Sequence, residues 1–384
     1  MKLAIVTTHP IQYYAPVFKL LQQRGKIDIH VFYTWGRRVS EKFDPGFGKI
    51  VDWDIPLLEG YTYSWAENIA HDAGTHHFFG INTPSLVGQI SDWKPDAVLF
   101  VGWAWYGHLK AMRFFKNRLP VFFRGDSTLF SNAPLWKNML RQPVLKWVYQ
   151  QIDTAFYVGK LNRSYFEHFG LSDRQLVFAP HAIDNDRFAA DHRKEASLLR
   201  AQLGVGPAEC LILFAGKFEA VKNIELLVTA FTELDLDGTH LLLVGQGPLE
   251  GMLKAIGADS RSPSAIHFMK FQNQSAMPSV YQSCDLFCLP SESETWGLAV
   301  NEAMACAKPV LISDTVGCAP DLLESNVNGL VFRSGDKDHL KACLNELTLS
   351  KERLKEMGKN SYDIIKDWSF EKIAEAIEKT LNYA

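Results

Sequence analysis

The sequence lacks any spacing of cysteines that would indicate a disulfide framework or a zinc site. Six cysteines occur among 384 residues. None forms a CxxC pair, and each lies among apolar or small residues: Cys210, Cys284, Cys288, Cys306, Cys318 and Cys343. Zinc sites and secreted disulfide scaffolds need closely spaced or dense cysteines. We therefore expect reduced, buried thiols in a cytoplasmic protein.

Long apolar runs and basic stretches are also missing. Met1 and Lys2 lead straight into LAIVTT, which is typical of a first strand and not of a secretion signal. No apolar run approaches the roughly 20 residues of a transmembrane helix. The 40 Lys+Arg and 43 Asp+Glu give a net charge of −3, which argues against a nucleic acid partner.

One stretch leaves membrane contact open. Residues 135–149 mix Lys137, Arg141 and Lys146 with Trp, Leu and Val, so peripheral contact with the inner face of a membrane is one interpretation. Three cations are few, and an ordinary amphipathic helix is favoured.

The chain alternates apolar strands with amphipathic helices, and it does so twice. Strands are predicted near 3–8, 27–35, 96–103, 121–125, 153–159 and 175–180, and again near 211–218, 240–248, 265–269, 285–290, 309–314 and 329–335. The pattern indicates an α/β fold with two doubly wound, mostly parallel sheets. Residues 36–90 form an irregular insertion in which we predict no strand.

This organisation predicts two Rossmann-like domains that face one another across a cleft. We expect a first domain over 1–188 and a second domain over 189–366. A C-terminal helix over 367–384 is expected to pack back on the first domain. Ligands of such sheets bind at the carboxyl ends of the strands.

The segment GKFEAVKN places two lysines just after a predicted strand. Gly216 permits a tight turn, and Lys217 and Lys222 then lie near the carboxyl edge of the sheet. Two ammonium groups there suit a diphosphate, whose negative charge grows as its bond to a sugar breaks. Two solvated surface lysines are an equally good interpretation of this segment alone.

The segment VGQGPLEG is similar to a dinucleotide-binding loop but does not match it. Gly245 and Gly247 fit, whereas Glu250 occupies the position of the third glycine. We favour a tight strand–helix turn whose backbone passes close to a ligand, and we disfavour a Rossmann oxidoreductase.

The segment SESETWG carries Glu294 on a loop before a helix that begins near Gly297 or Leu298, and Glu302 lies inside that helix. The helix start is a ready anion site. At 1.5 Å per residue the two carboxylates are about 8–12 Å apart, whereas a retaining glycosidase pair needs about 5–5.5 Å. They suit two ends of one long ligand, although exposed helix charges would have the same pattern.

Several of these segments together resemble retaining, GT-B-fold glycosyltransferases of family four, the glycosyl transferases group 1. ESETWGLAVNEAMACAKPV is similar to the family's E-x7-E segment, GKFEAVKN to its G-[RK]-x4-K segment and VGQGP to its G-x-G-P turn. SDTVGCAPDLL, NGLVF and HAIDNDRF resemble three further family segments, in the family's order.

The resemblance implies that the first domain binds the acceptor and that the second domain binds the nucleotide sugar. It also implies roles for residues of the second domain. Lys217 and Lys222 would neutralise the diphosphate, Glu302 would bind the ribose, and Glu294 would contact the donor hexose. The donor would further contact Gly216, Gly245, Gly247, Trp296, Gly297 and Leu298. The resemblance also implies retention at the anomeric carbon, no metal and no cofactor beyond the sugar nucleotide.

Roles in the N-terminal domain are less defined, because its strand ends depart from the family pattern. Asp126 and His108 are candidate catalytic residues near strand ends and are expected to face the cleft. Candidate acceptor contacts are His9, Gln12, Trp103, Trp105 and Arg124. A structural role fits each of them about as well.

The resulting hypothesis is a metal-independent retaining hexosyltransferase. It would use a nucleoside diphosphate sugar, with UDP-sugar favoured over GDP-sugar, and a hydroxyl of a saccharide, lipid-linked or small-molecule acceptor. Glycoconjugate or polysaccharide assembly is the expected setting. A nucleotide-sugar epimerase on the same fold, and a non-catalytic sugar-nucleotide-binding protein, are the alternatives.

Overall fold

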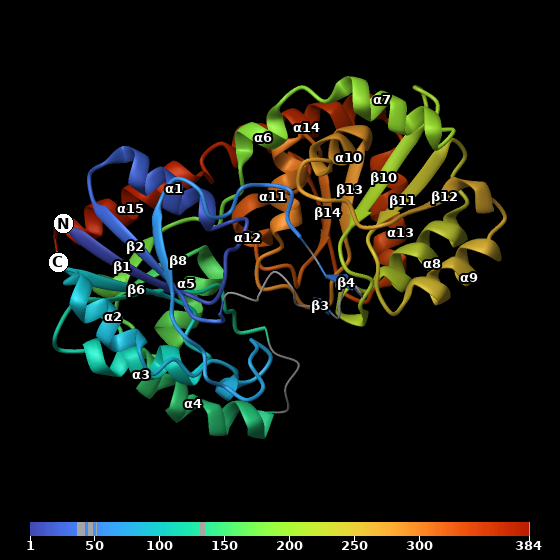
Figure 1. The fold of residues 1–384 in the computed structure, drawn as a ribbon. Coiled ribbons are helices and arrows are strands. Elements are labelled where there is room, and N and C mark those ends of the chain that lie inside the picture. The colour runs from blue at the N-terminus through green and yellow to red at the C-terminus, as the bar shows by residue number, and fades with distance from the viewer. Residues whose placement is uncertain (37–42, 45–48, 51, 131–134, 384) are drawn as a thin grey trace. The chain divides into compact units, whose positions relative to one another are not determined.

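The computed structural model describes residues 1–36, 43–44, 49–50, 52–130 and 135–383, with backbone alone for 43–44, 49–50 and 135–140. The chain divides into two compact units, each built on one parallel sheet (Figure 1). Unit 1 comprises Met1–Lys42, Ile55–His181 and Phe370–Ala384, and unit 2 comprises Phe43–Asp54 and Ala182–Ser369. Among the described residues, no helix has both the length and the apolar character that crossing a bilayer requires.

Unit 1 has a seven-stranded sheet in the order β5-β2-β1-β6-β7-β8-β9, with every pair parallel. Its strands are β1 Lys2–Thr7, β2 Asp28–Tyr33, β5 Thr62–Trp65, β6 Ala97–Val101, β7 Val121–Arg124, β8 Thr154–Tyr157 and β9 Leu176–Phe178. Its α-helices are α1 Ala15–Arg24, α2 Leu86–Trp93, α3 Tyr106–Phe115, α4 Leu135–Tyr149, α5 Lys160–His168 and α15 Phe370–Asn382.

Unit 2 has a six-stranded parallel sheet in the order β12-β11-β10-β13-β14-β15, the order of a doubly wound nucleotide-binding fold. The strands are β10 Cys210–Ala215, β11 Thr239–Val244, β12 Ile266–Met269, β13 Leu286–Leu289, β14 Val310–Ser313 and β15 Gly329–Phe332. The helices are α6 Asn185–Ala189, α7 Arg193–Gln202, α8 Ile224–Leu234, α9 Glu250–Ala258, α10 Met277–Ser283, α11 Leu298–Ala305, α12 Ala319–Leu322, α13 Lys337–Thr348 and α14 Lys351–Ile365. A short hairpin, β3 Phe43–Asp44 and β4 Lys49–Ile50, also belongs to this unit.

Burial explains why these segments take these forms. Every residue of β10, CLILFA, is buried, as expected for a parallel strand covered on both faces. In α8 the buried side chains include Ile224, Leu227, Val228 and Phe231. That spacing places them on one helix face against the sheet. The six cysteines are buried and free, and burial raises the pKa of each thiol above its usual value.

Strand β5 was missed by the sequence prediction. It lies within the 36–90 insertion and pairs with β2 at the edge of the sheet. Its four residues, TYSW, are exposed or half-buried, so the apolar run that marks the other strands is absent. Helix α4 occupies the predicted range 135–149, while the side chain of Lys137 lies outside the described residues.

The division into units differs from the predicted boundaries at three places, and one of them is at residues 367–369, which belong to unit 2 and not to the C-terminal helix. Residues 182–188 belong to unit 2, because Phe188 packs on Tyr281 with ring centroids 5.9 Å apart and its carbonyl accepts from Gln282. Residues 43–54 also belong to unit 2, where Asn273 Nδ2 donates to the Asp52 carbonyl at 2.6 Å.

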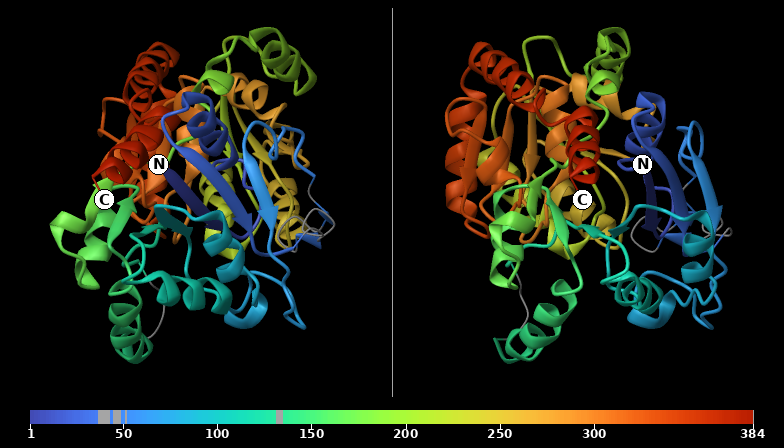
Figure 2. Two further views of the ribbon diagram at one scale, coloured as in Figure 1. Left: turned by 60° about the vertical axis from the view of Figure 1, so that its left-hand side comes forward. Right: turned by 90° about the vertical axis from the view of Figure 1, so that its left-hand side faces the viewer.

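The C-terminal helix α15 belongs to unit 1 and contacts α1, as Figures 1 and 2 show. Arg24 makes a bidentate contact with Glu378, at 2.7 and 2.9 Å. Lys26 adds a contact of 3.3 Å to the same carboxylate. These hydrogen bonds outweigh the effect of burial and hold the pKa of Glu378 below its usual value.

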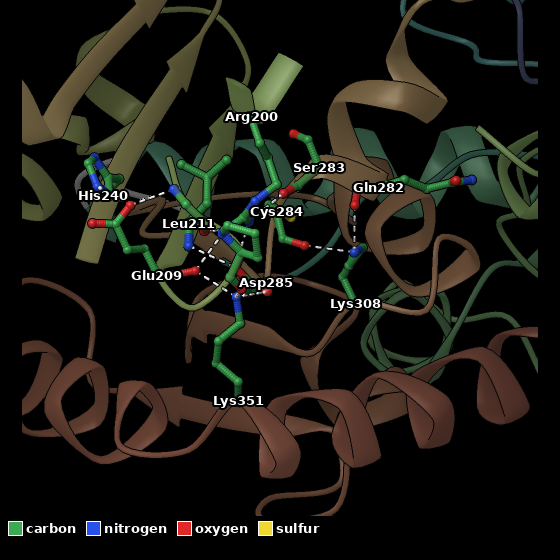
Figure 3. Close-up of polar contacts among 12 residues, drawn as sticks. Arg200, Glu209, Leu211, His240, Gln282, Ser283, Cys284, Asp285, Lys308 and Lys351 are labelled. Atoms are coloured by element: carbon green, nitrogen blue, oxygen red, sulfur yellow. Dashed lines mark hydrogen bonds and ion pairs between the residues drawn. The ribbon is translucent and has the colours of Figure 1, made fainter. Parts of the chain in front are cut away.

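The amino-terminal edge of the unit 2 sheet is held by an ion network around Asp285 (Figure 3). The carboxylate accepts from the Leu211 N–H at 2.9 Å and pairs with Arg200 at 2.8 Å and Lys351 at 3.1 Å. Arg200 also donates to the carbonyls of Ser283, Gly206 and Glu209. The network therefore ties α7 and α14 to β10 and β13.

Replacing Asp285 by Ala is expected to lower the free energy of unfolding by about 3 kcal/mol, because it leaves two mostly buried cations without their carboxylate. Chemical denaturation of both proteins measures the difference. Asp259→Ala is the matched control, since Asp259 is exposed at the end of α9. It is expected to change stability by less than about 0.5 kcal/mol. Equal losses in both variants would contradict the role given to the network.

Candidate functional site

The loops after β10 and β13 leave the unit 2 sheet on either side of the point at which strand order reverses. Ligands of doubly wound sheets bind at such a switch point, outside the carboxyl ends of the strands. The loop after β10 carries Gly216, Lys217 and Lys222, and the loop after β13 carries Glu294, Trp296 and Gly297. The structure thus brings together donor-side residues that were predicted from separate motifs.

The loops after β10 and β11 approach each other so closely that glycine is required. The Phe218 N–H donates to the Gln246 carbonyl at 2.9 Å. A Cβ on Gly245 would lie 1.9 Å from the Gly216 carbonyl oxygen, and Gly245 has a φ of +149°. A Cβ on Gly247 would lie 2.6 Å from the Phe218 carbonyl oxygen. These glycines hold the loops together, and their contact with a donor stays a prediction.

Lys222 and Glu294 form an ion pair at the switch point. Lys222 ends a single 3₁₀ turn, Ala220–Lys222, and its Nζ donates to Glu294 Oε2. The side chains are 22% and 18% exposed. The Glu292 N–H donates to the Val221 carbonyl at 2.9 Å and joins the two loops beside the pair. The sequence analysis missed this pairing, because 72 residues separate the two side chains.

The loop after β14 supports the Glu294 loop from its other side. The Gly317 N–H donates to the Glu294 carbonyl at 3.0 Å, and the Cys318 N–H donates to the Trp296 carbonyl at 2.9 Å. A Cβ on Gly317 would lie 1.9 Å from the Thr295 carbonyl oxygen. Glu294 therefore lies on a segment anchored by backbone contacts on both sides.

Helix α11 begins where the sequence predicted. Gly297, with φ +96°, precedes Leu298 at the helix start, and no side chain caps this end. The first-turn N–H groups and the positive end of the helix dipole favour an anion at such a terminus. The arrangement suits a phosphate beside the Lys222–Glu294 pair.

Two predicted donor residues point into the core of unit 2. Trp296 is 2% exposed, donates from Nε1 to Asn301 Oδ1 at 2.9 Å, and packs on Trp368 with centroids 5.1 Å apart. The ring therefore fills the core, and the expected contact of the backbone at Trp296 with a donor stays a prediction. Glu302 is 4% exposed and accepts from the Tyr281 hydroxyl at 2.8 Å. Its role in ribose binding stays a prediction.

His108, in unit 1, is not placed as expected. It lies in the first turn of α3 and is fully buried, with both ring nitrogens in hydrogen-bond contact. Nδ1 lies 2.9 Å from the Gly102 carbonyl oxygen, and Nε2 lies 2.7 Å from the Thr34 hydroxyl. Burial lowers the pKa of His108 to about 4, so the ring is neutral at physiological pH. Its contacts fit a structural role, and its catalytic role stays a prediction.

Arg124 is also structural. It is 2% exposed at the end of β7, and its guanidinium donates to the Ala179 carbonyl at 2.8 Å and the Pro180 carbonyl at 2.7 Å. These bonds hold the chain that follows β9. The possible contact of Arg124 with an acceptor stays a prediction.

Asp126 lies near Tyr14 and His181, which the sequence analysis did not include in the site. Tyr14 and His181 stack with centroids 6.2 Å apart. Burial lowers the pKa of His181 to about 4, which the charge of Asp126 partly opposes. Burial raises the pKa of Tyr14. Asp126 itself is half-buried, and its catalytic role stays a prediction.

His9 and Gln12 follow β1 and are half-buried. His9 Nδ1 lies 2.8 Å from the Thr8 hydroxyl, and its ring meets that of Trp35 edge-on at 5.0 Å. Burial lowers the pKa of His9 to about 4. A neutral His9 at a strand end can exchange hydrogen bonds with a hydroxyl, and acceptor contact stays a prediction for both residues.

Trp103 and Trp105 are half-buried, and both use their indole N–H within unit 1. Trp103 donates to the Tyr149 hydroxyl at 3.4 Å and packs against the hydrophobic core. Trp105 donates to the Thr75 carbonyl at 3.3 Å. Because both indole N–H groups are already bonded, the ring faces are the parts of these side chains that an acceptor would contact. That contact stays a prediction.

Comparison with known proteins agrees with this geometry. Residues 197–364, which include the whole of the unit 2 sheet, match the model of the glycosyl transferases group 1. Over these residues the chain is similar to that family. A D-inositol 3-phosphate glycosyltransferase from Segniliparus rotundus is 27% identical over 199 residues, which are 50% of this chain and 43% of that protein. The matched segment thus spans less than half the length of this relative.

Solved structures of other proteins share the fold of the whole chain. Sucrose-phosphate synthase from Thermosynechococcus elongatus has a TM-score of 0.76 and 18% identity, covering 100% of this chain and 98% of that one. HepE from Anabaena, solved with UDP-glucose, has a TM-score of 0.71 and 16% identity, with 100% of both chains covered. The fold is therefore GT-B, as the sequence predicted.

Proposed function

We propose that this protein is a retaining glycosyltransferase that moves a hexose from a nucleoside diphosphate sugar to a hydroxyl acceptor. The observation that carries the proposal is the Lys222–Glu294 pair at the switch point of unit 2, beside the start of α11. The family match over residues 197–364 supports the reaction class. The setting would be the assembly of a glycoconjugate or polysaccharide.

In this proposal unit 2 binds the donor. Lys217 and Lys222 stabilise the negative charge that grows on the diphosphate as the bond to the anomeric carbon breaks. The N–H groups at the start of α11 stabilise the same negative charge by hydrogen bonding and transfer no proton. Glu294 accepts from hexose hydroxyls and orients the sugar. These groups would perform the transfer without a metal at the phosphates.

UDP-sugar is the favoured donor, with GDP-sugar the alternative. HepE, which shares the fold, was solved with UDP-glucose. The acceptor is a hydroxyl of a saccharide, a lipid-linked saccharide or a small molecule, with His9, Gln12, Asp126 and the rings of Trp103 and Trp105 in unit 1 as candidate contacts.

A thermal-shift comparison of UDP, GDP, ADP and TDP tests the donor. We expect UDP to raise the unfolding temperature most, since a ligand at 100 times its Kd stabilises by about 2.7 kcal/mol. No shift with any nucleotide would contradict the proposal, and a larger shift with GDP would reassign the donor.

Product analysis then separates the proposed reaction from its alternatives. With a UDP-hexose in EDTA-treated buffer, we expect slow release of UDP and a free sugar whose first-formed anomer, observed by NMR, keeps the donor configuration. An epimerase would convert the sugar nucleotide without releasing UDP. A non-catalytic binding protein would return the donor unchanged.

A further inference from the structure

A second cluster of chemically active side chains lies in unit 1. Within the described part of the chain, the one group of three or more His, Cys, Asp or Glu placed to hold a metal ion is Asp72, His76 and His77. Their ligand atoms all lie within 4.8 Å of one another. Asp72 Oδ2 is 3.0 Å from His76 Nε2 and 3.3 Å from His77 Nε2. All three residues lie in the loop between β5 and α2.

These distances between ligand atoms fit the coordination of one metal ion. Nitrogen and oxygen ligands bind Zn²⁺ at about 2.0–2.2 Å, so two ligands of a tetrahedral ion lie about 3.3–3.5 Å apart. Small movements of the side chains would bring the ligand atoms to that spacing. Two imidazoles and one carboxylate are ligands that Zn²⁺ and other divalent transition metals take in proteins.

The loop that carries the ligands is closed by one asparagine. Asn68 Oδ1 accepts from the Ala70 N–H at 3.1 Å and from the Asn82 N–H at 2.9 Å. Asn68 Nδ2 donates to the Gly80 carbonyl at 2.9 Å. The two ends of the loop are therefore joined, and the ligands between them lie on a constrained backbone.

Two glycines let the ligand side chains converge. A Cβ on Gly74 would lie 2.5 Å from His76 Nδ1, so any other residue would displace that ring. A Cβ on Gly80 would lie 2.1 Å from the Gly74 carbonyl oxygen. The Gly74 N–H donates to the Gly80 carbonyl at 2.9 Å across the loop. This preorganisation reduces the entropy lost when a ligand set closes on an ion.

Hydrogen bonds alone are a competing explanation for the closeness of Asp72, His76 and His77. His77 Nε2 lies 3.0 Å from the Asp72 carbonyl oxygen, and a histidine–carboxylate contact of 3.0 Å is an ordinary hydrogen bond. However, the side chains of Asp72 and His76 are 68% and 64% exposed. Exposed pairs of this kind add at most about 1 kcal/mol of stability. Their contribution to stability is therefore too small to explain a loop that brings three such groups together, whereas metal binding explains it.

We propose that Asp72, His76 and His77 bind one divalent transition-metal ion of the Zn²⁺ class, with water at the open positions. Binding requires both imidazoles to carry their hydrogen on Nδ1 and to present Nε2 to the ion. The ion would lie in unit 1, whereas the proposed donor residues Lys217, Lys222 and Glu294 belong to unit 2. The proposal is therefore independent of the glycosyl transfer proposed above.

The test uses the full chain without a histidine tag, stripped with EDTA and dialysed. Zinc chloride is titrated by calorimetry, and cobalt chloride by visible absorption. We expect one equivalent of each metal to bind, with cobalt bands typical of nitrogen and oxygen ligands. The unfolding temperature should rise with zinc concentration, because an ion that binds the folded state stabilises it.

Variants assign the site to these residues. Losing a group that only orients a ligand costs about 10–100-fold in metal affinity, so H76A and D72A are each expected to weaken zinc binding by at least about 100-fold. H71A is the matched control, since His71 is exposed beside Asp72 but lies outside the cluster, and it should bind like the wild type. Thermal unfolding without metal verifies that each variant folds.

Two results would overturn the proposal. One is the absence of a stoichiometric site in the wild-type chain. The other is equal zinc affinity in H76A, H71A and the wild type, which would leave Asp72, His76 and His77 as a hydrogen-bonded loop with no metal.

Discussion

Replacing Lys222 by Ala is expected to lower kcat/KM for hexose transfer, or for donor hydrolysis, by about 100- to 1,000-fold. Loss of one preorganised group that stabilises developing negative charge has an effect of this size. In the free protein, Lys222 is paired with Glu294 at the switch point. Glu294→Gln keeps the shape of the side chain but removes its charge, and it is expected to reduce turnover to a similar extent.

The double variant shows whether the two residues act as one unit. If Lys222 and Glu294 position the same donor, the double substitution should cost little more than either single one, because coupled residues are not additive. Initial rates with the donor identified by thermal shift give the three values. If the fold-loss in kcat/KM of the double variant equals the product of the two single losses, the two residues act independently.

Glu292→Ala is the matched control for this series. Glu292 lies two residues from Glu294 with an exposed side chain, and only its backbone N–H joins the neighbouring loop. It should turn over like the wild type. Wild-type rates in a folded K222A protein would remove the basis of the site assignment.

Replacing Gly245 by Ala is expected to have the largest effect on stability among the glycines of VGQGPLEG. The new methyl group would lie 1.9 Å from the Gly216 carbonyl oxygen, at a φ of +149° that other residues rarely adopt. The loops after β10 and β11 must then separate. We expect a loss of about 2–4 kcal/mol in unfolding free energy. The shift produced by UDP should fall as well, because Lys217 lies on the displaced loop.

Gly251→Ala, in the same segment, is the control. No atom lies within 4 Å of a Cβ built on Gly251, which is in the first turn of α9. Alanine favours helix over glycine by about 1 kcal/mol, so this variant should be as stable as the wild type or more stable. Denaturation curves and the UDP shift of both variants give the comparison, and equal behaviour would contradict the role of close loop contact.

Much of the fold and part of the site were predictable from local pattern. Buried strands such as β10 are continuous apolar runs, and helices such as α8 repeat apolar residues with helical spacing. The start of α11 was predictable because Gly297 marks a turn before a helix. Strand β5 was not predictable, because an edge strand with half-exposed residues carries no such run.

The position of a residue along a strand predicts the edge of the sheet at which it lies. It does not predict whether the side chain is exposed. His108 and Arg124 occur near strand ends, where ligand contacts are common, yet both are buried. Both ring nitrogens of His108, and Nη1 and Nη2 of Arg124, are in hydrogen-bond contact with carbonyl or hydroxyl groups of unit 1. Trp296 occurs in a loop typical of donor binding, yet its ring packs on Trp368, which is 72 residues away. Most of these partners are distant in sequence.

By itself, the sequence determined the two doubly wound sheets, the helix start at Gly297 and Leu298, and the resemblance to group 1 glycosyltransferases, because strand and helix periodicity and glycine turns are local properties. Only the tertiary structure decided that Lys222 pairs with Glu294, that Glu302 binds Tyr281, and that Asp72, His76 and His77 converge. The first two arrangements depend on contacts between segments far apart in the sequence, and the third depends on a loop whose ends are joined by the Asn68 side chain. Contacts of this kind produce no periodic pattern in the sequence.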